Sequence, residues 1–506
     1  MKYFNGVVTL QAGGASLTAL DAETGRLMWQ YTGSSLPNGR GLFAIQDSLF
    51  MVEEDGIKQY SLEKPSKNVT DKTIITEVAS ALISTGDLEG AETLIEKVAR
   101  EMDPDYPPLR LARARLLLAN AKAKGQAPPI KAGLDLANYA NLAGRDSEAS
   151  RGAFDELTRD YGLLWHQSLE SAAPGSPQIV GGRLINLGFN IGSGQIIALN
   201  PVNGEVAWRQ PVQRFVDSVA VNSALFAITG DTNDPTAIGL NRIDAASGER
   251  KPIASWNQRP AVEFARIAYA SGRVFVEPVF RNFQGSRVQV SINAFDATNG
   301  RLLWQKDHPL EATRLLQQNP IGLWMPQGDR FIYSVGHDIW TVAAADGVVI
   351  DHQTEEGVIG PNSSRLPVAA GPVYFVNDRR EIVAYDAAQK TIRRSPRPEV
   401  DTTQLTMRGT LLFGTDTGWP FAFDFQSGFQ WKMPKGQGRG FLRLQDTGKR
   451  LWTLRDDNVL AAIDPRTGRI LRELPILWRP LSYSIIDGRF FASTSDGFAY
   501  AIQLPK

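Results

Sequence analysis

An eleven-residue unit recurs along this chain with its spacing unchanged, and it limits the possible folds more than any other feature. It reads A-F-D-A-T-N-G-R-L-L-W at 294–304, A-L-D-A-E-T-G-R-L-M-W at 19–29 and A-L-N-P-V-N-G-E-V-A-W at 198–208. Shorter copies, A-F-D-F-Q-S-G and A-I-D-P-R-T-G-R, begin at Ala422 and Ala462. A repeat of fixed length predicts an array of similar units that bury their apolar faces against one another.

Each unit is predicted to be a β-hairpin. Residues 292–296 alternate between two kinds of side chain with the period of two of a strand. The Asp, the small polar residues and the Gly that follow predict a tight turn, because the carboxylate accepts local N–H groups and Gly tolerates a positive φ. A Trp on the outer strand can bury about 150–250 Å², so we expect the indole to hold neighbouring sheets together.

The Asp of each unit, or its equivalent, marks the register of ten repeats. Apart from one long interval, which must hold an insertion, successive marks lie 38–52 residues apart. Four short strands have this length, which is the period of a propeller blade. The marks are Asp21, Ser61, Asn200, Asp244, Asp296, Ala343, Asp386, Asp424, Asp464 and Gln503.

These motifs resemble the pyrroloquinoline-quinone-like (PQQ-like) β-propeller repeat, with its A-x-D-x-x-T-G-x-x-x-W docking pattern. The resemblance covers residues 7–60 and 163–506, and it weakens at Ala343, Asp386 and Gln503, where the later Trp is missing. The structural docking motif is matched at Asp21, Gly25, Trp29, Trp165, Asn200, Gly204, Trp208, Asp244, Gly248, Asp296, Gly300, Trp304, Asp424, Gly428, Asp464 and Gly468.

Two incomplete repeats complement each other. The run L-L-W-H-Q-S-L at 163–169 begins like the outer strand at Leu302, but no inner strands precede it. The last repeat, 481–504, supplies three inner strands and then the chain stops. Joining the two closes a ring and removes both exposed edges. We therefore predict a mainly β fold in which residues 163–506 form an eight-bladed PQQ-like propeller, closed by pairing of 163–169 with the last blade. The alternative pairs 163–169 with the sheet around Ser61 and places all ten repeats in one ring.

Residues 70–162 change to a helical period. Gly86 separates two apolar stretches, and Ala137, Gly144 and Ala149 repeat the spacing of Ala79, Gly86 and Ala91. The segment resembles tetratricopeptide (TPR) hairpins, which commonly bind peptides, and a plain helical spacer is the alternative. The positions that carry the resemblance are Ile75, Val78, Ala79, Leu82, Gly86, Ala91, Ile95, Val98 and Pro104.

Residues 1–66 hold two PQQ-like repeats, with little before the first that could serve as an innermost strand. Two sheets cannot close a ring, and their edges would invite aggregation. These repeats therefore belong to the main propeller or form the tail of an upstream propeller.

Composition excludes several classes of chemistry. The chain has no Cys, which rules out disulfides, zinc–thiolate sites and thiol nucleophiles. Its 54 Lys and Arg balance 54 Asp and Glu, so no net charge attracts nucleic acid. No apolar run reaches the ~18–20 residues that span a bilayer, and the first residues lack the apolar core of a signal peptide. The family resemblance implies an extracytoplasmic location, in the periplasm or cell envelope.

The resemblance raises one enzyme hypothesis, a PQQ-dependent dehydrogenase. In the alcohol-oxidising members of that class a vicinal disulfide stacks on the quinone, and carboxylates hold a calcium ion beside it. The disulfide is impossible here, and no Asp or Glu aligns with the base or metal positions. We therefore expect no cofactor, with PQQ and calcium disfavoured, and no catalytic or metal residues. His166, His308, His337 and His352 are scattered over different repeats, so we expect structural or solvated roles for them.

An Arg stands just before the innermost strand in several repeats, on the connections that surround one mouth of a propeller channel. Together these residues could form a basic rim that binds carboxylates or an acidic peptide, although solvated loop residues would give the same pattern. The candidate rim comprises Arg214, Arg266, Arg314, Arg365, Arg439 and Arg479.

We expect a non-catalytic scaffold that binds other proteins, peptides or an extended ligand through this rim and the helices, without nucleic acid. The architecture resembles envelope assembly factors built on the same propeller. The alternatives are a PQQ-dependent dehydrogenase and a ligand sensor that uses the channel.

Overall fold

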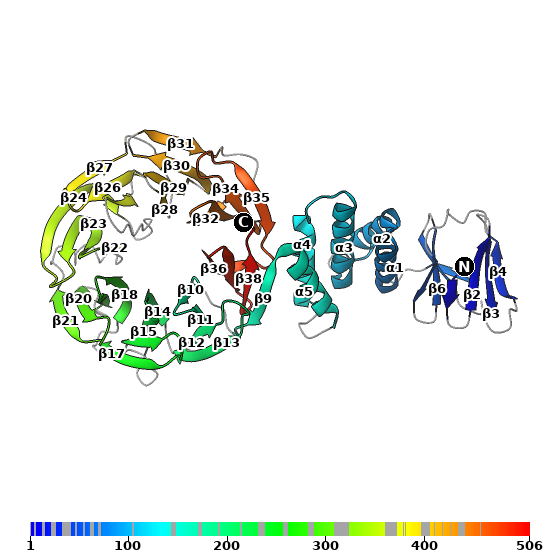
Figure 1. Cartoon of the computed structure of the whole chain (residues 1–506), viewed down its shortest axis with the longest axis horizontal. Helices are drawn as coiled ribbons and strands as arrows, with labels where there is room; N and C mark the ends of the chain where they lie inside the picture. Colours follow the sequence, from blue (N-terminus) through cyan, green and yellow to red (C-terminus); the bar gives the residue numbers. More distant parts are fainter. Residues whose placement is uncertain are drawn as a thin grey trace. The chain divides into compact units, whose positions relative to one another are not determined.

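The structure, a computed structural model, divides into two compact units, Met1–Tyr161 and Gly162–Lys506 (Figure 1). Before residue 72 it describes the backbone of strands β1–β8 alone. Beyond that point it describes residues 72–103, 106–142, 148–170, 175–190, 193–212, 215–230, 238–256, 262–281, 288–307, 323–359, 372–377, 379, 381–395, 405–408, 410–416, 418–425, 427–433, 441–455 and 457–505.

The first unit begins with two four-stranded antiparallel sheets, each in simple sequence order. Ala19 pairs with Trp29, as a hairpin at this repeat requires. The expectation that little precedes the first repeat to serve as an innermost strand is wrong, because β1 pairs with β2 at this edge. The strands are β1 (Lys2–Phe4), β2 (Val7–Ala12), β3 (Ser16–Asp21), β4 (Leu27–Thr32), β5 (Leu42–Ile45), β6 (Ser48–Glu53), β7 (Gly56–Tyr60) and β8 (Pro65–Asn68).

Five helices follow within the described part of this unit. Gly86 ends the first helix with a φ of +87°, which glycine adopts easily, and the Asp87 carboxylate then accepts the Gly90 N–H at 3.0 Å. The small residues Ala79 and Ala91 are fully buried, so the first two helices approach closely. The helices are α1 (Lys72–Thr85), α2 (Leu88–Glu101), α3 (Pro107–Ala123), α4 (Ile130–Leu142) and α5 (Glu148–Tyr161).

Neighbouring helices pack in sequence order, and α1 also packs against α3. Arg113 on α3 pairs with the buried Asp135 on α4, and Arg115 pairs with Glu156 on α5. Among the described residues no helix is long and apolar enough to cross a membrane.

The second unit is a ring of eight radially arranged sheets (Figure 1). The first blade consists of β10 (Gln178–Val180), β11 (Arg183–Asn190), β12 (Ser193–Leu199) and β13 (Val206–Val212). The second consists of β14 (Phe215–Val221), β15 (Ala224–Gly230), β16 (Ile238–Asp244) and β17 (Arg250–Trp256). The third consists of β18 (Val262–Ala270), β19 (Arg273–Arg281), β20 (Val288–Asp296) and β21 (Leu302–Asp307). The next two are described as three strands each, β22 (Leu323–Gln327), β23 (Arg330–Ala343) and β24 (Val349–Ile359), then β25 (Val373–Val376), β26 (Ile382–Asp386) and β27 (Thr391–Arg394).

The remaining three blades complete the ring. The sixth blade consists of β28 (Leu405–Arg408), β29 (Leu411–Asp416), β30 (Trp419–Asp424) and β31 (Gly428–Lys432). The seventh consists of β32 (Phe441–Asp446), β33 (Leu451–Arg455), β34 (Val459–Ile463) and β35 (Ile470–Pro475). The eighth consists of β36 (Pro480–Ile486), β37 (Arg489–Thr494) and β38 (Phe498–Gln503), together with β9 (Leu163–Ser168).

The ring closes where β9 pairs with β38, strands that lie at the two ends of this unit. Trp165 stands opposite Ala501, and the Gln503 N–H donates to the Gly162 carbonyl at 2.8 Å. The predicted eight-bladed propeller fold is therefore confirmed, with five described helices on its N-terminal side.

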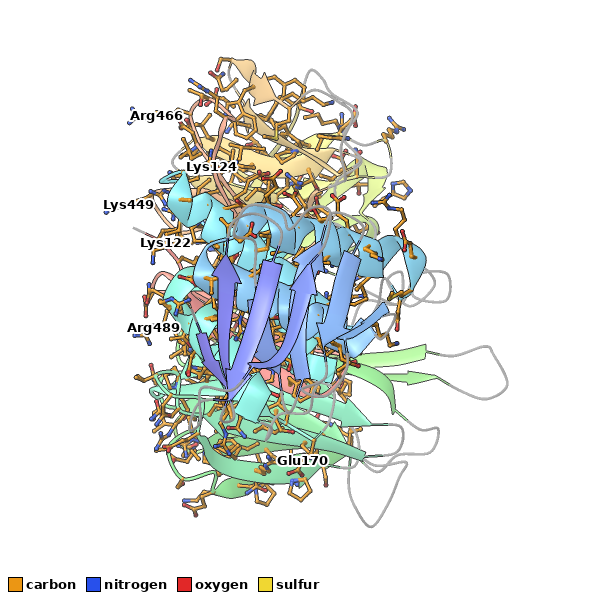
Figure 2. All side chains as sticks on the ribbon, turned by 90° about the vertical axis from the view of Figure 1, so that its right-hand side faces the viewer. Lys122, Lys124, Glu170, Lys449, Arg466 and Arg489 are labelled. Carbon is orange, nitrogen blue, oxygen red and sulfur yellow. The ribbon has the colours of Figure 1, made fainter. Side chains whose placement is uncertain are left out.

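The antiparallel order of the strands gives the ring two unlike faces. In a four-stranded blade, the turns that join the first strand to the second and the third to the fourth lie at one end; we call this side the turn face. The connections between blades lie at the opposite end, the loop face. Lys449 and Arg466 belong to turn-face turns, and Arg489 begins β37 directly after such a turn; Figure 2 shows all three along one side of the propeller.

Candidate functional site

Contacts between a tryptophan and a glycine join several neighbouring blades. In the first such pair, the indole of Trp208 lies directly against Gly248, whose φ is +76°. A Cβ at Gly248 would approach Trp208 Cδ2 to 2.7 Å, so the position has no room for a side chain. The Trp208 Nε1–H donates to the Ala245 carbonyl at 2.9 Å. This seam is therefore held by both packing and a hydrogen bond.

The Asp of the repeat shapes the turn that receives the indole. The Asp244 carboxylate accepts the backbone N–H groups of Ala246 and Ser247, at 3.1 and 2.9 Å. These bonds, chiefly that from Ser247, hold the pKa of Asp244 below its usual value. The Asp296 and Asp464 turns are built the same way, and their pKa values are also lowered by backbone N–H groups.

The same contact recurs at three other seams. In each, the indole N–H donates to the carbonyl of the residue that follows the register mark, at 2.9–3.2 Å. The pairs are Trp165 with Gly204, Trp304 with Gly347 and Trp431 with Gly468. The Trp165 contact lies at the closure of the ring.

Two members of these pairs were missed by the sequence pattern. Trp431 stands one residue early because its hairpin is shorter, with Asp424 paired directly to Gly428. Gly347 stands at the glycine position of the repeat whose register mark is Ala343, and this repeat has no Asp at its mark.

Two predicted glycines receive no indole. Gly300 packs against Ile253, and Gly428 meets no side chain of a neighbouring blade within 4 Å. Of the N-terminal repeat, Asp21 and Trp29 have only their backbone described, and Gly25 lies outside the described residues.

At the seam between the fourth and fifth blades, charged side chains stand where other seams have an indole and a glycine. Asp351 stands opposite Thr341, where Trp304 stands opposite Ala294 one blade earlier. The position of the receiving glycine is taken by Lys390, with a φ of +53°. Its Nζ lies 3.7 Å from Asp351 Oδ1, and the lysine side chain is about half exposed. An ion pair thus occupies the place of the aromatic contact.

Other groups at this seam make the hydrogen bond and the contacts between blades that the indole makes elsewhere. Arg330 donates to the Ala387 carbonyl at 3.4 Å, the carbonyl equivalent to the indole acceptors elsewhere. The Tyr385 hydroxyl lies 2.5 Å from Thr341 Oγ1 and donates to Asp351 at 3.1 Å. Burial raises the pKa of Tyr385 to about 12, so the hydroxyl stays protonated.

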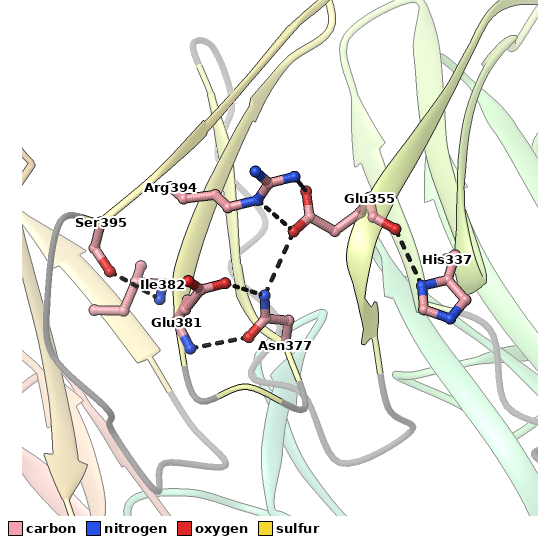
Figure 3. Close-up of polar contacts among 7 residues, drawn as sticks. All are labelled: His337, Glu355, Asn377, Glu381, Ile382, Arg394 and Ser395. Atoms are coloured by element: carbon pink, nitrogen blue, oxygen red, sulfur yellow. Dashed lines mark hydrogen bonds and ion pairs between the residues drawn. The ribbon is translucent and has the colours of Figure 1, made fainter.

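Further along the same seam a carboxylate is completely buried (Figure 3). Glu355 has a side-chain exposure of 0 % and accepts two hydrogen bonds from Arg394, at 2.8 and 3.2 Å. Asn377 donates to Glu355 at 3.4 Å and to Glu381 at 2.8 Å. The Nδ1 atom of His337 lies 3.0 Å from the Glu355 carbonyl oxygen. The network formed by His337, Glu355, Asn377, Glu381 and Arg394 is called the seam network below.

The seam network has the chemistry of a structural site. Its carboxylates are engaged by a guanidinium and an amide, which is how a protein satisfies buried charge. Within the part of the chain that the structure describes, no group of three or more His, Asp or Glu side chains could hold a metal ion.

The structure describes two of the six arginines of the predicted rim, Arg266 and Arg479. Arg479 lies exposed on the loop face between β35 and β36. Arg266 lies inside β18, not before it, and is 7 % exposed. The prediction that Arg266 precedes its innermost strand is therefore wrong, because β18 begins earlier than the sequence suggested. Arg214, Arg314, Arg365 and Arg439 lie outside the described residues, so their grouping into a rim stays a prediction.

The described histidines lie on two blades. His337 on β23 and His352 on β24 share the fourth blade, so the prediction that the histidines are scattered over different repeats is wrong for this pair. His166 on β9 packs against Trp478 with ring centroids 4.4 Å apart, and His352 on β24 contacts Asp338 at 2.9 Å. His337 belongs to the seam network, and His308 lies outside the described residues.

The closed ring of eight sheets, with its repeated Asp turns and Trp–Gly contacts, defines a PQQ-like β-propeller. The family model described as outer membrane protein assembly factor BamB matches residues 152–259 and 239–433, more than half of the chain. The chain belongs to this family.

No curated protein matches the chain. Among solved structures it is similar to BamB from Moraxella catarrhalis, with 13 % identity, 68 % of this chain and 100 % of that chain covered, and a TM-score of 0.49. It is similar to the computationally designed Ika8 protein, with 12 % identity, the same coverage and a TM-score of 0.49. It is also similar to Saccharomyces cerevisiae Sqt1, with 10 % identity, the same coverage and a TM-score of 0.47.

We predict that the same turn position tolerates different substitutions in different blades. Gly248→Ala should destabilise the protein by at least about 1–2 kcal/mol, the cost of a side chain in the left-handed region, because its Cβ also meets Trp208. Lys390→Gly should change stability little, since it relieves that backbone cost but removes an ion pair whose lysine is half exposed, a contact worth about 1 kcal/mol. Urea denaturation followed by circular dichroism measures both, and equal losses would refute the assignment of the two seams.

Glu355→Gln should destabilise the propeller by about 1.5–3 kcal/mol, the range for hydrogen bonds to charged groups. The variant keeps the volume of the side chain but leaves Arg394 without its counter-charge. Arg393→Gln, which neutralises an exposed residue on the same strand, is the matched control. The midpoints of urea denaturation of the two variants test this prediction. A midpoint for Glu355→Gln as high as that of the control would contradict a stabilising role for the seam network.

Proposed function

We propose that the protein is a non-catalytic interaction scaffold of the cell envelope, which binds other proteins or extended ligands through the loop face of its propeller and through its helices. The observation that carries this proposal is the family match, which extends over the first six blades. The family is described as an outer membrane protein assembly factor.

The inter-blade contacts support a scaffold role. The buried polar groups of the seam between the fourth and fifth blades are used within the protein, by Arg394, Asn377 and Tyr385. This use favours a rigid ring over a site that exchanges substrate. A scaffold also benefits from a loop face whose connections can vary without disturbing the strands beneath them.

The loop-face arginines are the proposed contact residues. Arg479 is exposed, and a guanidinium there can bind a carboxylate with two parallel hydrogen bonds. We extend this role to Arg214, Arg314, Arg365 and Arg439, which occupy corresponding connections in the sequence. The expected partners are proteins or peptides with accessible carboxylates, and PQQ and calcium stay disfavoured.

We predict that replacing five loop-face arginines by Gln reduces protein capture at least tenfold. The variant changes Arg214, Arg314, Arg365, Arg439 and Arg479, and tagged full-length protein is used to retain solubilised envelope proteins, which mass spectrometry quantifies. The control neutralises five residues elsewhere on the ring, namely Arg183, Lys251, Arg301, Arg393 and Lys432, and should bind as the unmodified chain does.

Two results would overturn the proposal. One is identical capture by the loop-face variant and the control. The other is a PQQ absorption band that stays with the protein after PQQ and calcium are added and the unbound PQQ is removed by gel filtration, which would favour the dehydrogenase.

A further inference from the structure

The outer strand of the seventh blade exposes two apolar side chains that are flanked by arginines. β35 begins I-L-R at Ile470, directly after Arg469, and it lies at the outer edge of its sheet, paired only with β34. Ile470 and Leu471 are 41 % and 54 % exposed, and Arg469 and Arg472 on either side are exposed as well. Two apolar side chains therefore stand in water between two cations.

Arg472 occupies the position at which several other outer strands carry the docking indole. Arg472 stands opposite Ala462, as Trp208 stands opposite Ala198 in the first blade. An indole there would dock on the hairpin of the next blade. In the eighth blade, however, that hairpin is replaced by the junction of Gln503 with Gly162. Arg472 therefore has no such hairpin beside it, while the exposure of Ile470 is shared by Leu302 and Val349, the equivalent residues of β21 and β24, at 48 % and 47 %.

The charges around this edge are mostly uncompensated. Lys449 and Arg466 lie in turns of the same blade, on the turn face (Figure 2). The carboxylate of Asp464 accepts the backbone N–H of Arg466 at 2.8 Å, and its negative charge lies near the guanidinium of that residue. Glu473 pairs with Arg455, and Asp446 pairs with Arg408. Among the described residues, no ion pair joins Arg469, Arg472 or Lys449 to a carboxylate.

We propose that β35 is a docking edge for an extended acidic segment of a partner protein. An edge strand offers alternating N–H and C=O groups that can accept one more strand. Glu or Asp side chains of the added strand would pair with Arg469 and Arg472, and its apolar side chains would cover Ile470 and Leu471. A second copy of β35 is disfavoured as the occupant, because like charges would face each other.

Other outer strands offer a useful contrast. On β24, Val349 and Ile350 are also exposed, at 47 % and 40 %, but Asp351 follows them and Asp346 precedes them. That edge has no arginine on either side of its exposed apolar pair. The arginines on both sides of Ile470 and Leu471 therefore provide selectivity for acidic partners as well as attraction.

This inference deepens the proposed function by naming a second surface, distinct from the loop-face arginines, and its partner chemistry. The probe is a labelled peptide of alternating Glu and Val, titrated with the full chain and followed by fluorescence anisotropy. We expect binding that weakens with salt, falls at least tenfold in the double variant Arg469→Glu with Arg472→Glu, and is unchanged in Arg301→Glu. Hydrogen exchange should show peptide-dependent protection of residues 470–474.

Three outcomes would overturn the proposal. The double variant could bind the peptide as well as the unmodified chain does, or protection could appear only on another strand. Alternatively, phosphatidylglycerol vesicles could bind in an arginine-dependent way while the peptide does not, which would assign the edge to a membrane surface. The five-Gln loop-face variant keeps Arg469 and Arg472, so it should still bind the peptide. This separates failure of the loop-face proposal from failure of the β35 proposal.

Discussion

An indole pressed against a glycine in the neighbouring sheet is the interaction on which this propeller depends. Each blade is a small sheet that cannot bury its own faces, so the ring holds together only through contacts between blades. The glycine provides the positive φ of the turn and leaves space for the ring of the tryptophan. At the closure, Trp165 makes the same contact from a strand that comes from the start of the unit.

The seam between the fourth and fifth blades shows that the fold accepts a different solution. There Asp351 and Lys390 replace the aromatic pair, and Glu355 with Arg394 adds a buried ionic contact. Buried ion pairs often contribute little net stability, because desolvation offsets their attraction. They do fix one geometry, however, since a shifted blade would leave buried charges unpaired. This seam therefore specifies the alignment of the blades more than it strengthens the ring.

The sequence predicted the fold well because the repeat records local chemistry. Asp turns and alternating strands are encoded within about ten residues. The two incomplete repeats, an outer strand at 163–169 and three inner strands at 481–504, indicated the eight-bladed ring. It predicted contacts between blades less well. Trp431 was missed because its hairpin is one residue shorter, and Asp351 and Lys390 were missed because their pairing joins two blades and matches no motif. The burial of Arg266 depends on where β18 begins, which local pattern does not fix.

The ring closure can be tested directly because the chain contains no Cys. Gln167 and Ala499 stand opposite each other in β9 and β38, and paired residues in antiparallel strands lie within the Cα separation that a disulfide requires. We expect the double variant Gln167→Cys with Ala499→Cys to form an intramolecular disulfide on mild oxidation, detected by mass spectrometry of the digested protein. The matched variant Gln167→Cys with Gln59→Cys should form none. A disulfide in the second variant and not in the first would contradict the eight-bladed ring.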